Sequence, residues 1–259
     1  MSAGLLLLVN FGCLAVLLAT LWLVSLRMRD ASIVDIVWGP AFAVVGWVTF
    51  AVGEGDQDRR LLLALLATAW GLRLGLHLAR RNLGKGEDPR YRAMRERRGE
   101  AFAIQSLYLV FLSQASLVWV VAMPIQAAGF PAATAELFWL DWLGVGVFLV
   151  GLGFEAVADV QLTRFRNDRA TSGRVLDTGL WRYTRHPNYF GDCMLWWGIG
   201  IVGIAAGAWW ALVGPVVMMI LLSRVSGKPL LEQSIRQRRP GYDDYVRRTS
   251  GFFPLPPKR

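Results

Sequence analysis

Cysteine and histidine are scarce in this chain. Its 259 residues include two cysteines and two histidines, and Cys13 and Cys193 each lie inside an apolar run. Two thiols placed in this way exclude a disulfide framework and a zinc cluster, so no metal site is expected. Basic residues are also missing ahead of the first apolar run, which is too long for a signal peptide. We therefore interpret that run as a retained helix.

Charge is absent from long stretches of the sequence. Apolar residues make up 54% of the chain and the mean hydropathy is +0.39, which is high for a soluble protein. Apolar runs of about 20 residues recur, and this length is typical of transmembrane helices. The sequence therefore predicts an all-α integral membrane protein. Its seven transmembrane helices are expected at residues 3–26, 32–52, 61–80, 104–121, 137–165, 188–204 and 209–223.

The basic residues orient these helices. Of 28 Lys and Arg residues, 25 fall in loops that the helix order places on one side of the membrane, whereas Arg59 and Arg60 fall on the other. Because cytoplasmic loops are enriched in basic residues, we predict an outside N-terminus and a cytoplasmic C-terminus, in a bacterial inner membrane. Loop topology and anionic headgroups account for the net charge of +9, so no nucleic-acid partner is expected.

Three ionisable side chains lie inside the predicted helices of the N-terminal half. Asp35 stands in IVDIVWGP with no adjacent cation, and Arg73 and His77, four residues apart, share one face of the third helix. Such residues are costly inside a membrane and indicate a functional site. Two structural alternatives stay open: Arg73 as the ion-pair partner of a carboxylate, and His77 as a hydrogen-bonded interior histidine.

The fifth predicted helix repeats this pattern. Glu155 and Asp159 are four residues apart, and Arg166 continues their face seven residues further on. With the residues above, they predict a polar cavity between helices that opens to the cytoplasm. The GxGxxG at residues 198–203 lies within a membrane helix rather than after a strand, so we assign its glycines to close helix packing.

The stretch Asp177–Trp197, DTGLWRYTRHPNYFGDCMLWW, joins a basic loop to an apolar segment. Arg185 and His186 lie at the mouth of that segment, and Asn188 and Asp192 share one helix face beyond it. In the alternative interpretation this is a membrane-proximal basic loop in which Asn188 caps the helix. That alternative does not explain the carboxyl group of Asp192 inside an apolar helix, so we favour a binding site.

This stretch resembles the C-terminal signature of the membrane steroid 5α-reductases, a GGLF-x-Y … N-[FY]-x-G-E … E-W pattern. The matching residues are Gly179, Leu180, Trp181, Tyr183, Asn188, Tyr189, Gly191, Asp192 and Trp196. The upstream GFEAVADVQLTRFR is similar to the aspartate and arginine helix of that family at Asp159 and Arg166. Bacterial 5α-reductase-like membrane proteins share DIVWG and RHPNYFG. The resemblance covers the C-terminal half well and the N-terminal half poorly.

The resemblance implies a seven-helix enzyme that uses NADPH to reduce the 4,5 double bond of 3-oxo-4-ene steroids or similar enones. It implies a single membrane domain, with substrate-side helices in residues 1–128 and cofactor-side helices and a cytoplasmic tail in residues 129–259. The arginines around the loop between the fifth and sixth helices would hold the phosphate groups of NADPH, because a guanidinium is permanently charged and its forked geometry matches phosphate. The implied cofactor residues are Asp159, Arg166, Arg174, Tyr183, Arg185, His186, Asn188, Tyr189, Asp192 and Trp196.

Departures from the family affect the proton donor. Leu195 replaces its second acid, its Gln-Glu pair is absent, and its catalytic tyrosine in the third helix has no clear match. An enone that accepts hydride needs a donor at its carbonyl oxygen. We expect Asp35, held protonated by desolvation, to be that donor, with His77 or Arg73 as alternatives. Trp38 is expected to form a wall of the substrate cavity.

A second family offers a different reaction. RHPNY also resembles the RHPxY element of isoprenylcysteine and phospholipid methyltransferases, which bind S-adenosylmethionine. Leu231, Glu232, Tyr242 and Tyr245 fit the tail of those enzymes. The long third-to-fourth loop, DIVWG and NYFGD favour the reductase. A transporter or lipid-binding protein is a third alternative, but it does not explain why the charges concentrate around one loop.

Overall fold

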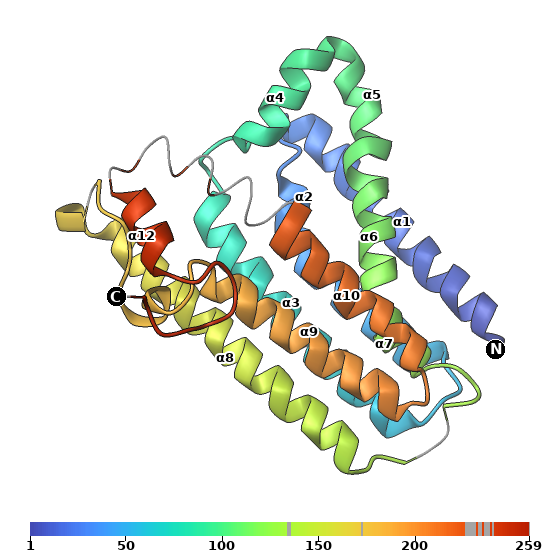
Figure 1. Cartoon of the computed structure of the whole chain (residues 1–259). Helices are drawn as coiled ribbons and strands as arrows, with labels where there is room; N and C mark the ends of the chain where they lie inside the picture. Colours follow the sequence, from blue (N-terminus) through green and yellow to red (C-terminus); the bar gives the residue numbers. More distant parts are fainter. Residues whose placement is uncertain are drawn as a thin grey trace. The chain divides into compact units, whose positions relative to one another are not determined.

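The computed structural model of the chain is helical, with one isolated β-bridge, and it confirms the predicted all-α class (Figure 1). The structure describes residues 1–133, 136–171, 173–225, 232, 235, 239 and 241–258. Within these residues, five helices are long and apolar enough to cross a membrane: Ala3–Met28, Ile33–Val52, Gln57–Asn82, Pro89–Val121 and Trp139–Asn167. The chain is a multi-pass membrane protein.

The last two expected spans differ from these five. α9 (Pro187–Ala205) has 19 residues, but polar side chains interrupt its first turns and it is not among the five apolar helices. The final expected span consists of a 3₁₀ turn, α10 (Val213–Ile220) and a π-helical segment (Leu221–Val225). Its apolar stretch is shorter than the others. The structure thus supports five spans, and the count of seven and the orientation of the termini remain predictions.

The chain divides into two compact units. Unit 1 comprises Met1–Asp141 and Val202–Gly214, and unit 2 comprises Trp142–Ile201 and Pro215–Arg259. Unit 1 contains α1 (Ala3–Met28), α2 (Ile33–Val52), α3 (Gln57–Asn82), α4 (Pro89–Arg98), α5 (Phe102–Ser106), α6 (Ser113–Val121) and α7 (Met123–Ala127). Unit 2 contains most of α8 (Trp139–Asn167) and α9, together with α12 (Tyr242–Arg248). The single membrane domain divided after residue 128 remains a prediction.

Glycines let α2 and α3 pack with their backbones in contact. A Cβ atom on Gly39 would lie 2.7 Å from the carbonyl oxygen of Gly71, and one on Gly75 would lie 3.0 Å from that of Ile36. Only small residues permit such an approach between membrane helices. Because Asp35 precedes Ile36, this packing sets it level with the last turns of α3.

The segment predicted as a charged loop, residues 81–100, contains α4. Asp88 accepts a hydrogen bond from the backbone nitrogen of Arg90 at 2.9 Å, and Pro89 occupies the first helical position. Both features start helices. Gly99 ends α4 with a φ of +57°, a conformation that favours glycine, and the chain bends there into α5 (Figure 1). The loop prediction was wrong because it gave the arginine-rich composition more weight than the capping residues.

Arg59, expected in an outside loop, is fully buried against Asp141. Its Nε lies 2.7 Å from Oδ1 of Asp141 and its Nη2 lies 2.9 Å from Oδ2, and both side chains are 0% exposed. The backbone nitrogen of Phe138 also donates to Oδ2, at 3.0 Å. This bidentate, charge-assisted pair ties the start of α3 to the start of α8.

Small residues also bring α8 and α9 together within unit 2. A Cβ atom on Gly191 would lie 2.5 Å from the backbone nitrogen of Glu155, and one on Gly198 would lie 2.6 Å from the carbonyl oxygen of Gly144. The packing role predicted for Gly198 is therefore confirmed. The same contact places the first turns of α9 beside the second half of α8.

Candidate functional site

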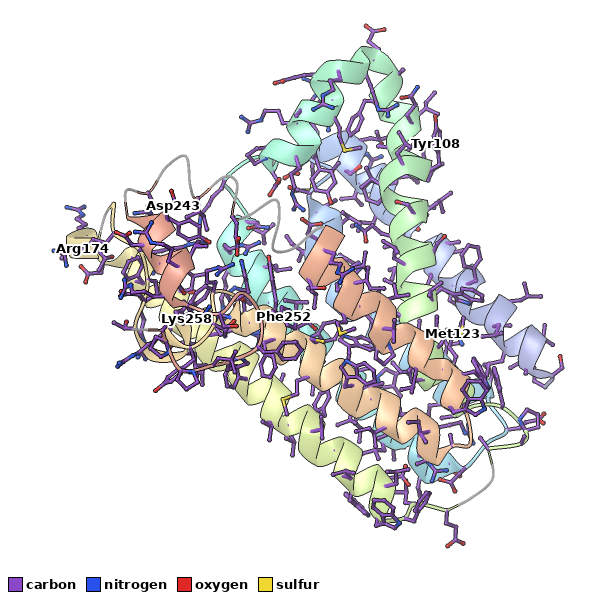
Figure 2. All side chains as sticks on the ribbon, in the orientation of Figure 1. Tyr108, Met123, Arg174, Asp243, Phe252 and Lys258 are labelled. Atoms are coloured by element: carbon purple, nitrogen blue, oxygen red, sulfur yellow. The ribbon has the colours of Figure 1, made fainter. Side chains whose placement is uncertain are left out.

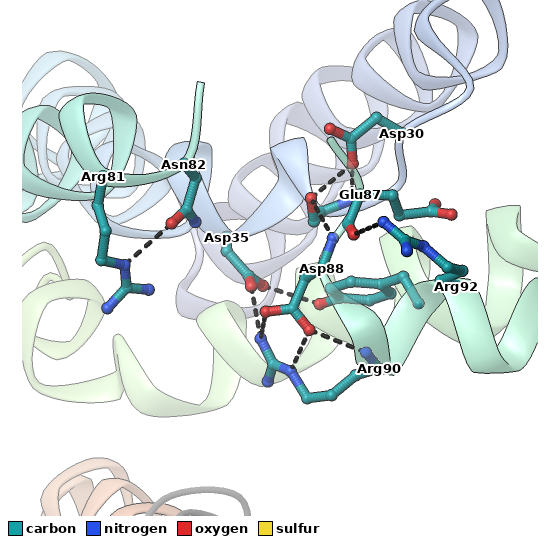
Figure 3. A network of polar contacts seen from close by, with 10 residues as sticks. Asp30, Asp35, Arg81, Asn82, Glu87, Asp88, Arg90 and Arg92 are labelled. Atoms are coloured by element: carbon teal, nitrogen blue, oxygen red, sulfur yellow. Dashed lines mark hydrogen bonds and ion pairs between the residues drawn. The ribbon is translucent and has the colours of Figure 1, made fainter. Parts of the chain in front are cut away.

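Asp35 lies at the centre of a polar cluster in unit 1, at the start of α2 (Figure 3). Its Oδ2 accepts a hydrogen bond from Nη2 of Arg90 at 2.8 Å, and its Oδ1 accepts one from the hydroxyl of Tyr91 at 2.8 Å. Tyr91 is only 7% exposed, so this contact is shielded from water. The two oxygens of the Asp35 carboxyl group thus face a guanidinium and a phenol.

Acidic residues just before α4 fasten that helix to the turn between α1 and α2. Oε1 of Glu87 accepts hydrogen bonds from the backbone nitrogen of Ala31 at 2.8 Å and from Nη2 of Arg95 at 2.7 Å. Burial raises the pKa of Glu87, but the hydrogen bonds from Arg95 and Ala31 outweigh burial and bring that pKa below its usual range. The backbone nitrogen of Asp88 adds a bond to Oγ of Ser32 at 3.3 Å.

The structure only partly unites the predicted catalytic residues. Arg73 and His77 lie on α3, as expected. The ion-pair partner of Asp35 is Arg90, and its carboxyl group lies within hydrogen-bond distance of a guanidinium and a phenol. The roles of Arg73 as the partner of a carboxylate and of Asp35 as a protonated acid stay predictions.

Trp38 lies three residues beyond Asp35 on the same face of α2. Its ring packs edge to face against Phe42, with ring centroids 5.0 Å apart, and against Trp70, with centroids 6.1 Å apart. Its Nε1 is buried and has no hydrogen-bond partner among the described residues. An unpaired buried N–H is costly, so this indole can donate to an acceptor on a ligand. Its predicted role as a substrate-cavity wall stays a prediction.

Sequence reasoning missed Arg90 and Tyr91. They lie 55 and 56 residues from Asp35 along the chain, and nothing in their own spacing links them to it. The available signal was the helix start at Asp88 and Pro89, which places both residues in the first turn of a helix. Their contact with α2 depends on the packing of unit 1.

Glu232 joins two of the predicted cofactor residues in unit 2. Its Oε1 lies 2.9 Å from Nε of Arg185 and 2.9 Å from Nε2 of His186. Arg185 also donates to the backbone oxygens of Thr249 at 2.7 Å and Val246 at 3.2 Å. Burial raises the pKa of Glu232, but hydrogen bonds from His186 and Arg185 outweigh burial and hold that pKa at about 2. The ionised carboxylate fixes both basic side chains.

Asn188 lies within the first turn of α9 rather than at its cap, so the capping interpretation was wrong. Its Nδ2 donates to Oδ1 of Asp159 on α8 at 3.2 Å, which unites two predicted cofactor residues. Asp159 and Asp192 are both buried. The ring of Tyr189 stacks on His186, with centroids 5.4 Å apart and an interplanar angle of 4°.

Three predicted arginines border one pocket of about 110 Å³ in unit 2. Arg166 comes from the end of α8, Arg174 from the loop that follows, where Figure 2 labels it, and Arg185 from the loop before α9. Arg239, which was not predicted, adds a fourth guanidinium. The rest of the lining is apolar or aromatic: Leu162, Phe165, Val175, Leu176, Trp181, Ile235, Tyr242 and Tyr245. Four permanent positive charges around a pocket of this size fit a phosphate group, which is one part of a larger anion.

Seven of the ten predicted cofactor residues lie outside this pocket lining, and Tyr183 and Trp196 are two of them. Tyr183 is 43% exposed in the loop before α9, and Trp196 is fully buried within α9. The backbone oxygen of Tyr183 accepts a hydrogen bond from the backbone nitrogen of Leu255 at 3.0 Å, so this loop is tied to the C-terminal segment. The assignment of both side chains to the cofactor stays a prediction.

The residues that fit the methyltransferase tail lie near the same pocket. Tyr242 and Tyr245 line it, and Glu232 binds the Arg185 guanidinium at its edge. The hydroxyl of Tyr245 donates to the backbone oxygen of Trp181 at 2.5 Å, which anchors α12. Leu231 lies outside the described residues.

Comparisons with known proteins cover most of the chain. A family model described as "Protein of unknown function (DUF1295)" matches residues 21–249, a range that includes both polar clusters. The "Uncharacterized protein C594.04c" of Schizosaccharomyces pombe is 25% identical over 268 residues, which cover 90% of this chain and 75% of that protein. No solved structure matches the chain significantly.

Proposed function

The chain belongs to this DUF1295 family of membrane proteins, and on that premise we propose that it is an NADPH-dependent reductase of lipophilic enones. The reaction saturates a double bond conjugated to a carbonyl, such as the 4,5 double bond of a 3-oxo-4-ene steroid. The observation that carries the proposal is the four-arginine pocket of unit 2. The resemblance of residues 177–197 to the steroid 5α-reductase signature supports it.

The charge of this pocket favours NADPH over S-adenosylmethionine. Arg166, Arg174, Arg185 and Arg239 bring four positive charges, and Glu232 offsets one of them. A dinucleotide phosphate carries a pyrophosphate and a 2′-phosphate, which guanidinium groups bind through paired hydrogen bonds. S-adenosylmethionine carries a sulfonium and an ammonium group, and like charges at close range are unfavourable. The pocket therefore fits the polyanion better.

In this proposal, the arginines of unit 2 bind phosphate oxygens of the cofactor. A bound NADPH supplies the hydride that the β-carbon of the enone accepts. The half-buried Asn188, hydrogen-bonded to Asp159, offers a polar group to the ribose or carboxamide at the reactive end of the cofactor.

Tyr91 in unit 1 becomes the proposed proton donor. Hydride addition places negative charge on the enone carbonyl oxygen, and a hydroxyl aimed at that oxygen stabilises the charge and completes the reduction by giving its proton. In the structure this hydroxyl donates to Asp35, so it must break that hydrogen bond before it gives its proton to the enone oxygen, and Asp35 holds it in place until then. Arg90, paired with Asp35, stabilises the phenolate until a proton from water restores the hydroxyl. Asp35 is then a positioning residue.

The charged ends of the helices are proposed to face the cytoplasm of a bacterial inner membrane. The basis is the segregation of 25 of 28 basic residues into loops on one side. A cytoplasmic cavity also gives the enzyme access to the NADPH pool. Reporter fusions that place residue 259 outside the cytoplasm would refute this orientation.

The test is a binding titration followed by an assay on the purified protein in lipid nanodiscs. We expect NADPH to bind at least about tenfold more tightly than NADH, because a charge-assisted hydrogen bond to the 2′-phosphate is lost in NADH. We then expect progesterone to be reduced at its 4,5 double bond when NADPH is present. Failure to bind NADPH, or binding without reduction of any enone tested, would refute the reductase.

A methyltransferase is the second candidate, and one observation favours it. Glu232, Arg185 and His186 form a single cluster, and all three belong to the residues that resemble methyltransferases. Tighter binding of S-adenosylmethionine than of NADPH in the same titration would establish this alternative. The two outcomes are exclusive, because both ligands compete for the pocket beside this cluster.

A further inference from the structure

We propose that unit 2 binds one anionic phospholipid through its C-terminal segment, residues 249–258. The lipid phosphate occupies a basic pocket, and one acyl chain occupies an apolar slot that the same segment lines. This site is separate from the proposed reductase pocket, and its existence does not depend on the reductase activity.

The basic pocket has a volume of about 610 Å³. Arg182, Arg248 and Lys258 line it, and Asp177 is the single acidic residue among the described lining residues. Arg248 lies 3.7 Å from Asp177, whereas the other two cations have no ion-pair partner among the described residues. The hydroxyls of nearby threonines add hydrogen-bond donors. This surplus of positive charge at an open pocket fits a phosphate group.

The apolar slot has a volume of about 360 Å³, within the usual range for ligand pockets. Its lining contains no charged side chain and consists of Phe190, Cys193, Met194, Trp197, Met219, Phe252 and Phe253. The four residues from α9 follow the spacing of one helix face, opposite the face that carries Asn188 and Asp192. The slot is therefore distinct from the proposed cofactor site and fits a hydrocarbon chain.

Backbone hydrogen bonds hold the C-terminal segment between these features. The hydroxyl of Thr184 donates to the backbone oxygen of Phe252 at 2.8 Å, and the backbone nitrogen of Lys258 donates to the oxygen of Arg248 at 2.9 Å. Phe252 borders the slot and Lys258 borders the basic pocket, and Figure 2 labels both. One ordered segment therefore presents an apolar wall and a cationic wall to the same ligand.

The exposed side chains of this segment decide between a lipid and a free phosphate. Phe253 is 62% exposed and Leu255 is 56% exposed, only a few residues from the cations. Aromatic and apolar groups beside basic residues are typical of the membrane–water interface. A soluble phosphate would leave these side chains and the slot in water, whereas a phospholipid covers both.

The headgroup is tested by thermal melting of the detergent-purified protein with added lipid. Dioleoylphosphatidylglycerol should raise the melting temperature more than dioleoylphosphatidylcholine, which has the same chains. The double variant Arg248→Gln/Lys258→Gln should bind the anionic lipid roughly 25-fold more weakly, about fivefold for each cation. Arg247→Gln is the matched control, since Arg247 lies on the same helix but outside the pocket lining. Equal effects of the two lipids, or equal losses in control and double variant, would overturn the headgroup site.

The binding of the acyl chain is tested in two ways, with soluble glycerol phosphate and with a variant in which a larger side chain fills the apolar slot. Glycerol phosphate should stabilise the wild-type protein far less than the intact lipid, because it leaves the slot empty. Cys193→Phe should weaken lipid binding and leave the weak response to glycerol phosphate unchanged. Equal stabilisation by glycerol phosphate and lipid in the wild-type protein would show a free-phosphate site and refute the lipid, whether or not the variant folds.

Discussion

The polar clusters of the two units differ in how their charges are balanced. In unit 1, Asp35 and Glu87 each bind an arginine, and the acids and bases form a connected network (Figure 3). In unit 2, four arginines border one pocket, and Glu232 pairs with one of them, Arg185. A balanced network fixes a helix and orients a hydroxyl, whereas surplus charge at a pocket attracts an anion. The difference separates proton transfer from cofactor binding.

Tyr91→Phe tests this division most strongly. The variant keeps the ring but loses the proposed transferable proton, so turnover of an NADPH-dependent enone should fall by about 10²–10⁴-fold. NADPH affinity should stay unchanged, because the phosphate pocket lies in the other unit. Steady-state assays and a fluorescence titration measure the two quantities. Wild-type turnover in this variant would return the donor role to His77.

Asp141→Asn tests what a balanced pair contributes when it is fully buried. The change leaves the Arg59 guanidinium buried without its anionic partner, so the free energy of unfolding should fall by about 3–5 kcal/mol. Chemical denaturation in detergent measures the loss. Asp244→Asn is the control, because its pair with Arg247 is exposed and should contribute little. Similar losses in both variants would mean that burial does not set the strength of these pairs.

Arg174→Gln tests the surplus charge of unit 2. Loss of one charge-assisted hydrogen bond to a phosphate should weaken NADPH binding by about 10- to 100-fold, and NADH binding by less if the bond is to the 2′-phosphate. Arg164→Gln is the matched control, since Arg164 lies near the end of the same helix as Arg166 but does not line the pocket. Identical titrations for the two variants would argue against the pocket as the cofactor site.

The smallest expected effect concerns the pH dependence of Glu232. Because its folded pKa of about 2 lies below the usual glutamate value of 4.5, its ionised form stabilises the fold above about pH 4.5. That stabilisation is lost as the pH falls through the window between these values. Glu232→Gln should therefore melt at a lower temperature than the wild type near pH 6, and the gap should shrink below pH 4.5 until the two curves converge near pH 2. A constant gap across this range would contradict the assigned pairing.

The long apolar helices could be predicted from the sequence because membrane spans carry a strong signal. α1 and α2 begin and end within two residues of their predicted bounds. α4 was missed because a ten-residue helix rich in arginine has the composition of a loop, and only Asp88 and Pro89 mark its start. The burial of Arg59 was also unpredictable, since its partner lies 82 residues away.

The candidate site of unit 2 was easier to predict than that of unit 1. Arg166, Arg174 and Arg185 flank a single loop, so their nearness in sequence became nearness in space. Asp35 could be singled out by its apolar surroundings, but its partners could not, because they depend on how α4 folds back on α2. The outlying Arg239 lies in a tail without apolar periodicity, which left no pattern to follow.

The backbone contact between α2 and α3 has a mechanical consequence. With Gly39 against Gly71, sliding one helix by a single residue, about 1.5 Å, would drive the chain into a facing carbonyl group. The two helices therefore do not slide along each other and move together as one rigid pair. Because Asp35 lies on α2 and accepts a hydrogen bond from Tyr91, a movement of this helix pair would carry both residues with it.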